Sequence, residues 1–90
     1  MKINFATAKK LIESADVIKN IDDSTVFTRI APRCIMFRWE DRNTLYNVSA
    51  YDLDNASVEK QGNILTFSVF DGDGHDVGFA VSLFKLSPLK

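Results

Sequence analysis

The sequence predicts a single α+β domain in which one N-terminal amphipathic helix packs on a mainly antiparallel sheet of four to five strands, arranged as a meander. Apolar residues recur with helical spacing only near the N-terminus, and beyond that segment the chain is a series of short β-rich runs separated by turn residues. A chain of 90 residues has room for one core, because a domain of this size buries about 60–65% of the surface of its unfolded chain. One compact domain is therefore predicted to span residues 1–90.

The helix is predicted from Phe5 to about Asn20. At 100° per residue the apolar side chains of this segment fall within an arc of about 140°, and they are Phe5, Ala8, Leu11, Ile12, Ala15 and Ile18. We expect this stripe to face the sheet. Asn4 is expected to cap the first turn, and Asn20 is expected to close the last turn in the left-handed conformation. Ile3 is expected to add an edge strand before the helix.

Turn residues at positions 22–24 separate the predicted helix from the β-rich part of the chain. We predict strands at residues 24–30 and 33–40, interrupted at Pro32 because proline has no amide hydrogen to donate to a sheet ladder. In the second of these runs, the side chains on one face of the strand are all apolar. They are Ile35, Phe37 and Trp39.

Two further strands are predicted before the C-terminal hairpin. A turn at residues 41–43 leads to a strand at 45–53, and a short strand at 57–60 ends at a turn at 61–63. Apolar and polar residues alternate only loosely in the strand at 45–53.

The C-terminal hairpin is the most strongly specified element. The apolar faces of its two strands are formed by Leu65, Phe67 and Val69, and by Val77, Phe79, Val81 and Leu83. Both faces must meet the same core, so Val69 is predicted to lie opposite Val77, with Phe67 opposite Phe79. A slip by one residue would turn every apolar side chain outward. This register places Asp71 opposite His75 and leaves a three-residue loop ending at Gly74, which adopts positive φ without steric cost.

Composition and charge argue against several classes of protein. The formal net charge is -1 and the pI is about 5.7, so no overall basic field exists to hold nucleic acid or an anionic membrane. No run approaches the roughly 20 apolar residues that span a bilayer, and no membrane partner is expected. Cys34 is the single cysteine and has no internal disulfide partner, and the N-terminus lacks the pattern of a secretory signal. We therefore expect a cytoplasmic protein.

No constellation of residues predicts catalysis or a metal site. Asp71, Asp73 and Asp76 beside His75 resemble the alternating ligands of a hard cation, but the chain enters an apolar strand instead of supplying the remaining ligands of a calcium loop. Cys34 lies in the middle of a predicted strand and His75 on a hairpin tip, so a nucleophile and base pair is not expected. We expect no metal, no cofactor and no enzymatic activity.

The remaining asymmetry is in the arginines. All four lie within fourteen residues, and residues 1–42 carry eight basic and six acidic side chains against three and six in residues 43–90. Arginine suits bidentate contacts with carboxylates or phosphates, and it is enriched with tryptophan and tyrosine at binding hot spots. The predicted binding residues are Arg29, Arg33, Arg38, Trp39, Arg42 and Tyr46.

A structural interpretation of the same segment stays open. In it, Arg38 pairs with an acidic residue on a neighbouring strand, Asp41 and Arg42 form a solvated turn, and Trp39 belongs to the core.

Three functional hypotheses follow. The first is a non-catalytic protein-binding module whose partner has an acidic surface, such as a small accessory, immunity-type or phage-type inhibitor that occupies a site on another protein. The second is a local nucleic-acid binder that contacts the phosphate backbone through residues 29–42, which is less favoured because a lysine-rich or aromatic-studded track is missing. The third is a homo-oligomer, for example a homodimer, formed through an exposed strand edge at residues 26–30 or 45–53.

Overall fold

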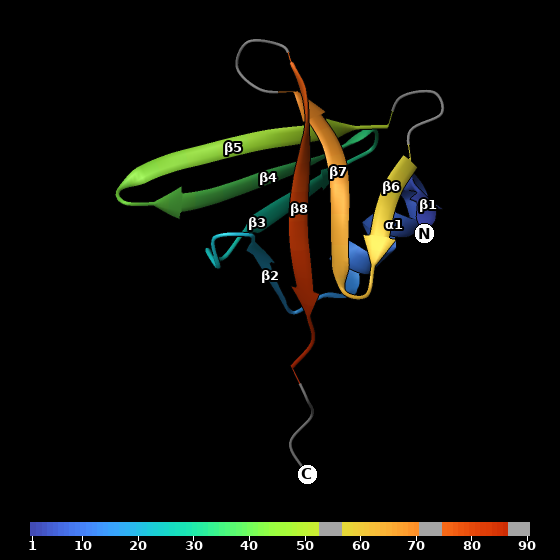
Figure 1. The fold of residues 1–90 in the computed structure, drawn as a ribbon, viewed down its shortest axis with the longest axis horizontal. Coiled ribbons are helices and arrows are strands. Elements are labelled where there is room, and N and C mark those ends of the chain that lie inside the picture. The colour runs from blue at the N-terminus through green and yellow to red at the C-terminus, as the bar shows by residue number, and fades with distance from the viewer. Residues whose placement is uncertain (53–56, 71–74, 87–90) are drawn as a thin grey trace.

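The computed structural model describes residues 1–52, 57–70 and 75–86, which fold into one helix and two antiparallel sheets (Figure 1). The elements are β1 (Lys2–Asn4), α1 (Phe5–Ser14), β2 (Val17–Asn20), β3 (Phe27–Ala31), β4 (Cys34–Asp41), β5 (Thr44–Tyr51), β6 (Ser57–Gln61), β7 (Ile64–Phe70) and β8 (Asp76–Phe84). One sheet has the strand order β1-β6-β7-β8-β2 and the other β3-β4-β5. The predicted α+β class and antiparallel pairing are confirmed, whereas the prediction of one sheet is wrong.

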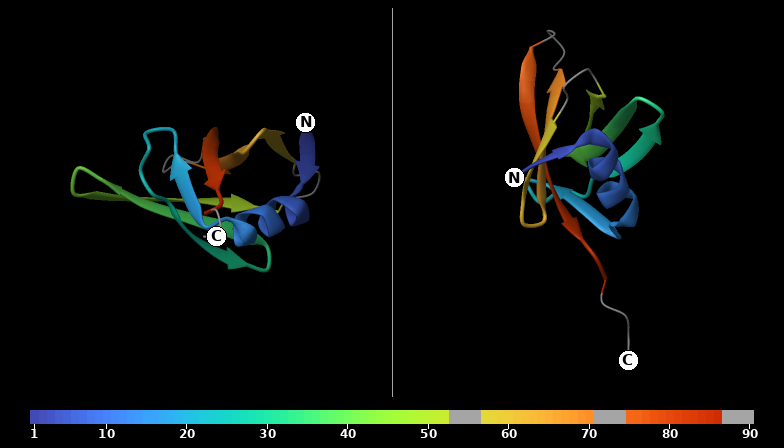
Figure 2. Two further views of the ribbon diagram at one scale, coloured as in Figure 1. Left: turned by 90° about the horizontal axis from the view of Figure 1, so that it is seen from below. Right: turned by 90° about the vertical axis from the view of Figure 1, so that its right-hand side faces the viewer.

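The two sheets pack against each other across their strands. In Figure 1, β4 and β5 run horizontally where β7 and β8 run vertically, and β5 contacts β7. Helix α1 lies between the five-stranded sheet and the β3–β4 hairpin (Figure 2, right). On one side the Phe5 ring meets Phe67 edge-on, with 6.3 Å between centroids, and on the other the Lys9 ammonium donates to the carbonyl of Pro32 at 2.7 Å.

Helix α1 begins where the sequence predicts. The amide of Thr7 donates to Oδ1 of Asn4 at 2.7 Å, so Asn4 is the N-cap as expected. The same residue ends β1, where Ile3 lies opposite Val58 of β6. The predicted edge strand before the helix is therefore confirmed.

The prediction that the helix continues to about Asn20 is wrong. The helix stops at Ser14, and residues 17–20 form β2, which pairs with β8 so that Ile18 lies opposite Leu83. Val17 and Ile18 are β-branched and suit a strand. Ala15 and Ile18 fit the helical stripe, but burial also alternates along β2 with a period of two. Residues 17–20 form a strand and not a helix because they pair with the edge of β8.

Asn20 is consequently not a helix cap. It ends β2 as a buried residue, and its Oδ1 accepts hydrogen bonds from the amides of Asp22 and Ser24, both at 3.0 Å. These bonds hold the turn that was predicted at residues 22–24, where Asp23 has a φ of 66°.

The remaining strands lie close to their predicted positions, displaced by a few residues at their ends. β3 starts at Phe27 instead of residue 24, and β5 ends at Tyr51, while residue 53 lies outside the described part of the chain. The register of the β7–β8 hairpin is confirmed, with Val69 opposite Val77 and Phe67 opposite Phe79. The predicted three-residue loop at residues 72–74 lies outside the described residues.

One core unites the helix and the two sheets. Its buried apolar side chains are Phe5, Ala8, Ile12, Ile18, Val26, Ile35, Phe37, Ala50, Val58, Leu65, Phe67, Val69 and Val81. Val77 is an exception to the predicted apolar face, since it is 40% exposed at the end of the hairpin. None of the described helical residues forms a segment long and apolar enough to cross a bilayer.

Candidate binding face

The three-stranded sheet has a buried face and an exposed face, which its pairing register assigns. Residues directly opposite each other in an antiparallel pair point to the same side. In β4, Ile35 and Phe37 are fully buried, so Met36 and Arg38 between them point the other way. We call this second side the outer face. Its residues are Phe27, Arg29 and Ala31 from β3, Cys34, Met36, Arg38 and Glu40 from β4, and Leu45, Asn47, Ser49 and Tyr51 from β5.

The outer face combines exposed apolar groups with arginine. Phe27 is 68% exposed and Leu45 is 56% exposed, and they flank Arg38 on the two neighbouring strands. A shallow groove of about 530 Å³ runs over this region, lined by outer-face residues that include Phe27, Arg29, Arg38 and Leu45. Large apolar side chains left exposed around charged groups are typical of surfaces that bind other molecules.

Arg29 and Arg38 are brought together on this face. Arg38 lies opposite Phe27, and Arg29 lies opposite Met36. The two arginines are therefore diagonal neighbours on adjacent strands, a position at which Cα atoms lie about 7–8 Å apart. Both are exposed, and within residues 1–52, 57–70 and 75–86 neither forms an ion pair. The cross-strand partners of Arg38 are Phe27 and Asn47. The acidic cross-strand partner of the structural interpretation is therefore not observed.

Trp39 and Tyr46 point to the opposite side of the sheet. Their rings stack with 5.6 Å between centroids and 15° between planes, and the indole also stacks on Phe79 of the other sheet at 5.0 Å. Trp39 is partly buried against the core, as the structural interpretation predicts, while Tyr46 is 44% exposed. These aromatic residues do not share a surface with the outer-face arginines.

Arg33 and Arg42 lie at opposite ends of β4. Arg33 belongs to the β3–β4 turn and Arg42 to the β4–β5 turn, and about 30 Å of extended chain separates them. The residues predicted to bind therefore form no single patch. Closeness in sequence suggested one site, but a strand sends alternate residues to opposite sides and carries residues nine positions apart to its two ends.

Sequence reasoning missed the apolar members of the outer face. Phe27 and Leu45 look like core residues in sequence, because large apolar side chains in strands are usually buried. Leu45 is exposed because it lies opposite Glu40 on the outer face, which points away from the five-stranded sheet. The β4–β5 hairpin that carries it extends beyond β8 in Figure 1. Because side chains alternate along a strand, the sequence places Phe27 on the same side as Arg29. The pairing register is needed to show that this side of the sheet is the exposed one.

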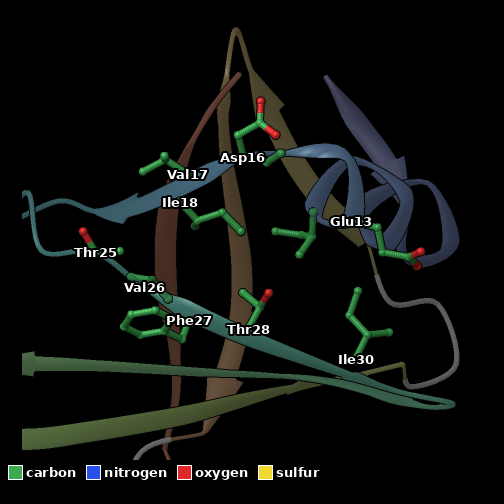
Figure 3. Close-up of a pocket in the computed structure, with 11 residues that line it drawn as sticks. Glu13, Asp16, Val17, Ile18, Thr25, Val26, Phe27, Thr28 and Ile30 are labelled. Carbon is green, nitrogen blue, oxygen red and sulfur yellow. The ribbon is translucent and has the colours of Figure 1, made fainter. Parts of the chain in front are cut away.

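A second hollow, of about 790 Å³, lies between the end of α1, β2 and β3 (Figure 3). Its lining is mainly apolar. In Figure 3, Ile18 points into the space from β2, and Thr28 and Ile30 point into it from β3. The carboxylates of Glu13 and Asp16 are on the rim and point away from the hollow.

Cys34 and His75 lie at strands of different sheets. Cys34 begins β4 in the three-stranded sheet, whereas His75 precedes β8 in the five-stranded sheet. Among the residues that the structure describes, no three or more histidine, cysteine, aspartate or glutamate side chains are grouped so as to hold a metal. Asp71 and Asp73 lie outside those residues, so the rejection of a metal loop there stays a prediction. The prediction of no enzymatic activity also stays a prediction.

Comparisons with protein-family models, with curated proteins and with solved structures find no match to this chain.

Proposed function

We propose that the protein is a non-catalytic binding module whose outer face docks on an acidic surface of another protein. The observation that carries the proposal is the pair of exposed guanidinium groups, Arg29 and Arg38, which have no carboxylate partner among the described residues and lie between exposed apolar side chains. Docking would occlude the part of the partner that it covers. This is the mode of action of a small inhibitor or immunity-type protein.

The chemistry of the face favours carboxylates as the groups it meets. A guanidinium binds a carboxylate through two parallel hydrogen bonds. Glu40 is the one acidic residue of the face and lies opposite Leu45, toward the hairpin tip. Burial of Phe27 and Leu45 would supply apolar area at the same site, and each square ångström of it contributes roughly 25 cal/mol. The face thus offers both the charge and the apolar surface of a binding hot spot.

Nucleic acid is the weaker alternative because the arginines are divided. Two of the four share the outer face, and Arg33 and Arg42 occupy the two turns. A phosphate-binding surface would show affinity that falls with salt, with a slope of about one for each phosphate contacted.

Self-association is the third hypothesis. β3 and β5 are the outermost strands of the three-stranded sheet. The segments expected to pair, residues 26–30 and 45–53, therefore include its two edge strands. Sedimentation at two concentrations tests it, since a dimer formed through these edges would raise the sedimentation coefficient with concentration.

The proposal is tested by comparing two charge-reversal variants in pull-downs from lysate of the native host after nuclease treatment. Arg29→Glu/Arg38→Glu changes the outer face, and Arg33→Glu/Arg42→Glu makes the same change in net charge at the two turns. We expect a protein partner that is retained by the wild type and the turn variant and lost by the face variant. Equal recovery by the two variants would contradict the proposal, and recovery that requires intact nucleic acid would support the alternative. Circular dichroism of each variant establishes that it is folded.

A further inference from the structure

The exposed edge of β3 carries unpaired backbone groups. Ala31 and Cys34 flank the two-residue turn of the β3–β4 hairpin, and the residues that flank such a turn exchange both of their backbone hydrogen bonds. Hydrogen-bonded pairs alternate along an antiparallel ladder, so Arg29 and Phe27 also bond to β4. The amides and carbonyls of Thr28 and Ile30 consequently point away from β4.

Within residues 1–52, 57–70 and 75–86, no strand pairs with Thr28 or Ile30 on the side away from β4. The amide of Val26 donates to the carbonyl of Ile18 at 2.7 Å, which confirms that alternate residues from Val26 onward direct their backbone groups toward β2. The pairing stops there, because the amide of Asp16 donates to Phe84 of β8 instead and the chain before it turns into α1. Among the described residues nothing else hydrogen-bonds Thr28 or Ile30 from this side. Their backbone groups therefore face the hollow of about 790 Å³ in Figure 3.

We propose that the acidic partner binds by adding an extended segment of alternating apolar and acidic residues to β3 as a fourth, antiparallel strand. This inference rests on the proposed function and names the part of the partner that docks. Main-chain hydrogen bonds to an exposed strand edge supply affinity in this mode of recognition, and side-chain positions on the two faces supply specificity.

The register dictates the alternation. Residues of the added strand opposite Thr28 and Ile30 point to the same side as those side chains, into the hollow beside Ile18, where an apolar group fits. The residue opposite Arg29 points to the outer face instead. There it meets a guanidinium that has no carboxylate partner in the described part of the chain, so an acidic residue fits.

The probe for this inference is a ten-residue peptide of alternating valine and glutamate, added to protein labelled with nitrogen-15. We expect saturable chemical-shift changes centred on the amides of Thr28 and Ile30. The counterpart with lysine in place of glutamate should bind at least tenfold more weakly. Arg29→Glu should reverse this preference, and Arg33→Glu, the matched charge change at the turn, should leave it unchanged.

Backbone methylation of the peptide distinguishes strand addition from simple charge attraction. In the proposed register the valine amides bond to β3 and the glutamate amides point away. N-methylation of the valines should weaken binding at least tenfold, while N-methylation of the glutamates should change it less than threefold.

Equal binding of the two methylated peptides, or shifts centred on Met36 and Arg38 without Thr28 and Ile30, would overturn strand addition. The proposed function would survive that result if the partner captured from lysate were still lost by Arg29→Glu/Arg38→Glu. Retention of the partner by that variant would instead contradict the proposed function itself.

Discussion

Phe37 joins the two sheets directly. Its side chain in β4 is fully buried, and its ring lies 5.2 Å from Phe67 and 5.1 Å from Phe79, centroid to centroid, across the packed faces. Tilted contacts between aromatic rings at this spacing add to the apolar area that they bury.

Truncation of this ring should therefore be severe. We expect Phe37→Ala to lower the free energy of unfolding by about 3–5 kcal/mol, since it removes a large buried side chain and leaves a cavity. Phe27→Ala in the neighbouring strand is the matched control, because Phe27 is 68% exposed and its loss should change stability by no more than about 0.5 kcal/mol. Urea denaturation of both variants measures the difference, and equal destabilisation would contradict the assignment of the two faces.

The fold changes the ionisation of Glu59. The ammonium of Met1 donates to its Oε1 at 2.8 Å, and this hydrogen bond, followed by the positive charge of the ammonium, lowers the pKa of Glu59 below its ordinary value. The contact joins the start of the chain to β6. Because the pKa is lowered in the folded state, the stabilisation is present above the ordinary pKa of glutamate and is lost as pH falls through the folded-state value.

Acetylation of the Met1 amine should raise the pKa of Glu59 toward its ordinary value, which a carbon-13 NMR titration of the side-chain carboxyl measures. In Glu59→Gln, acetylation should change stability less between the ordinary pKa of glutamate and neutral pH; the part that remains belongs to the second hydrogen bond of the amine, to the carbonyl of Lys60 at 3.1 Å. A titration midpoint that acetylation leaves in place would show that another group lowers it.

Single residues also show the limits of sequence reasoning. Asn4 and Asn20 were both predicted to cap the same helix, and only Asn4 does so. An asparagine side chain accepts equally well from amides at a helix start or in a turn. The role of Asn20 was decided by the strand that ends there, which pairs with a segment more than sixty residues away in sequence.

At the scale of elements, the β4–β5 turn is strained at one position. Arg42 and Asn43 have φ values of 50° and 66°, as in the two-residue turns that match the twist of a hairpin. Asparagine adopts this conformation readily, but arginine does so at a steric cost. The turn was predicted at residues 41–43, although its conformation was not.

Arg42→Asn should therefore stabilise the protein by about 0.5–1 kcal/mol. Arg33→Asn is a matched control in the other turn of β4, where φ is not positive, and it should bring no such gain. Thermal unfolding of the two variants measures the effect. A gain of the same size from the Arg33 substitution would show that removal of positive charge, and not backbone strain, is responsible.

The β7–β8 hairpin and the α1–β2 junction show which elements a sequence specifies. In the hairpin, apolar residues alternate over long runs, and one register alone turns both runs inward, so Val69 and Val77 were paired correctly. At the junction, Ile18 fits both the apolar stripe of a helix and the period of two of β2. Local pattern could not resolve that ambiguity, because the deciding hydrogen bonds come from β8.

At the scale of the whole molecule, the helix and both sheets contribute to one cluster of buried side chains. Phe37 from the smaller sheet contacts Phe67 and Phe79 from the larger one, and Phe5 of the helix contacts Phe67. Neither sheet could keep its apolar face from water alone.

The described parts of the chain should consequently unfold in one cooperative transition. Trp39 fluorescence reports the packing between the sheets, since its indole stacks on Phe79, and far-ultraviolet circular dichroism reports the helix and strands together. We expect the two signals to have the same denaturation midpoint. Separate midpoints would show that the sheets unfold independently.

Sequence alone determined the α+β class, the N-terminal cap, the edge strand at Ile3 and the register of the last hairpin, because each depends on spacing within a short segment. Tertiary structure alone decided that the strands divide into two sheets and that residues 17–20 form a strand instead of continuing the helix. It also decided that Arg29 and Arg38 share an exposed face with Phe27, whereas Trp39 packs against the core. These outcomes depend on which distant strand supplies hydrogen bonds and which face is covered. Such long-range pairings are settled by the packing of the whole chain and leave no local pattern in it.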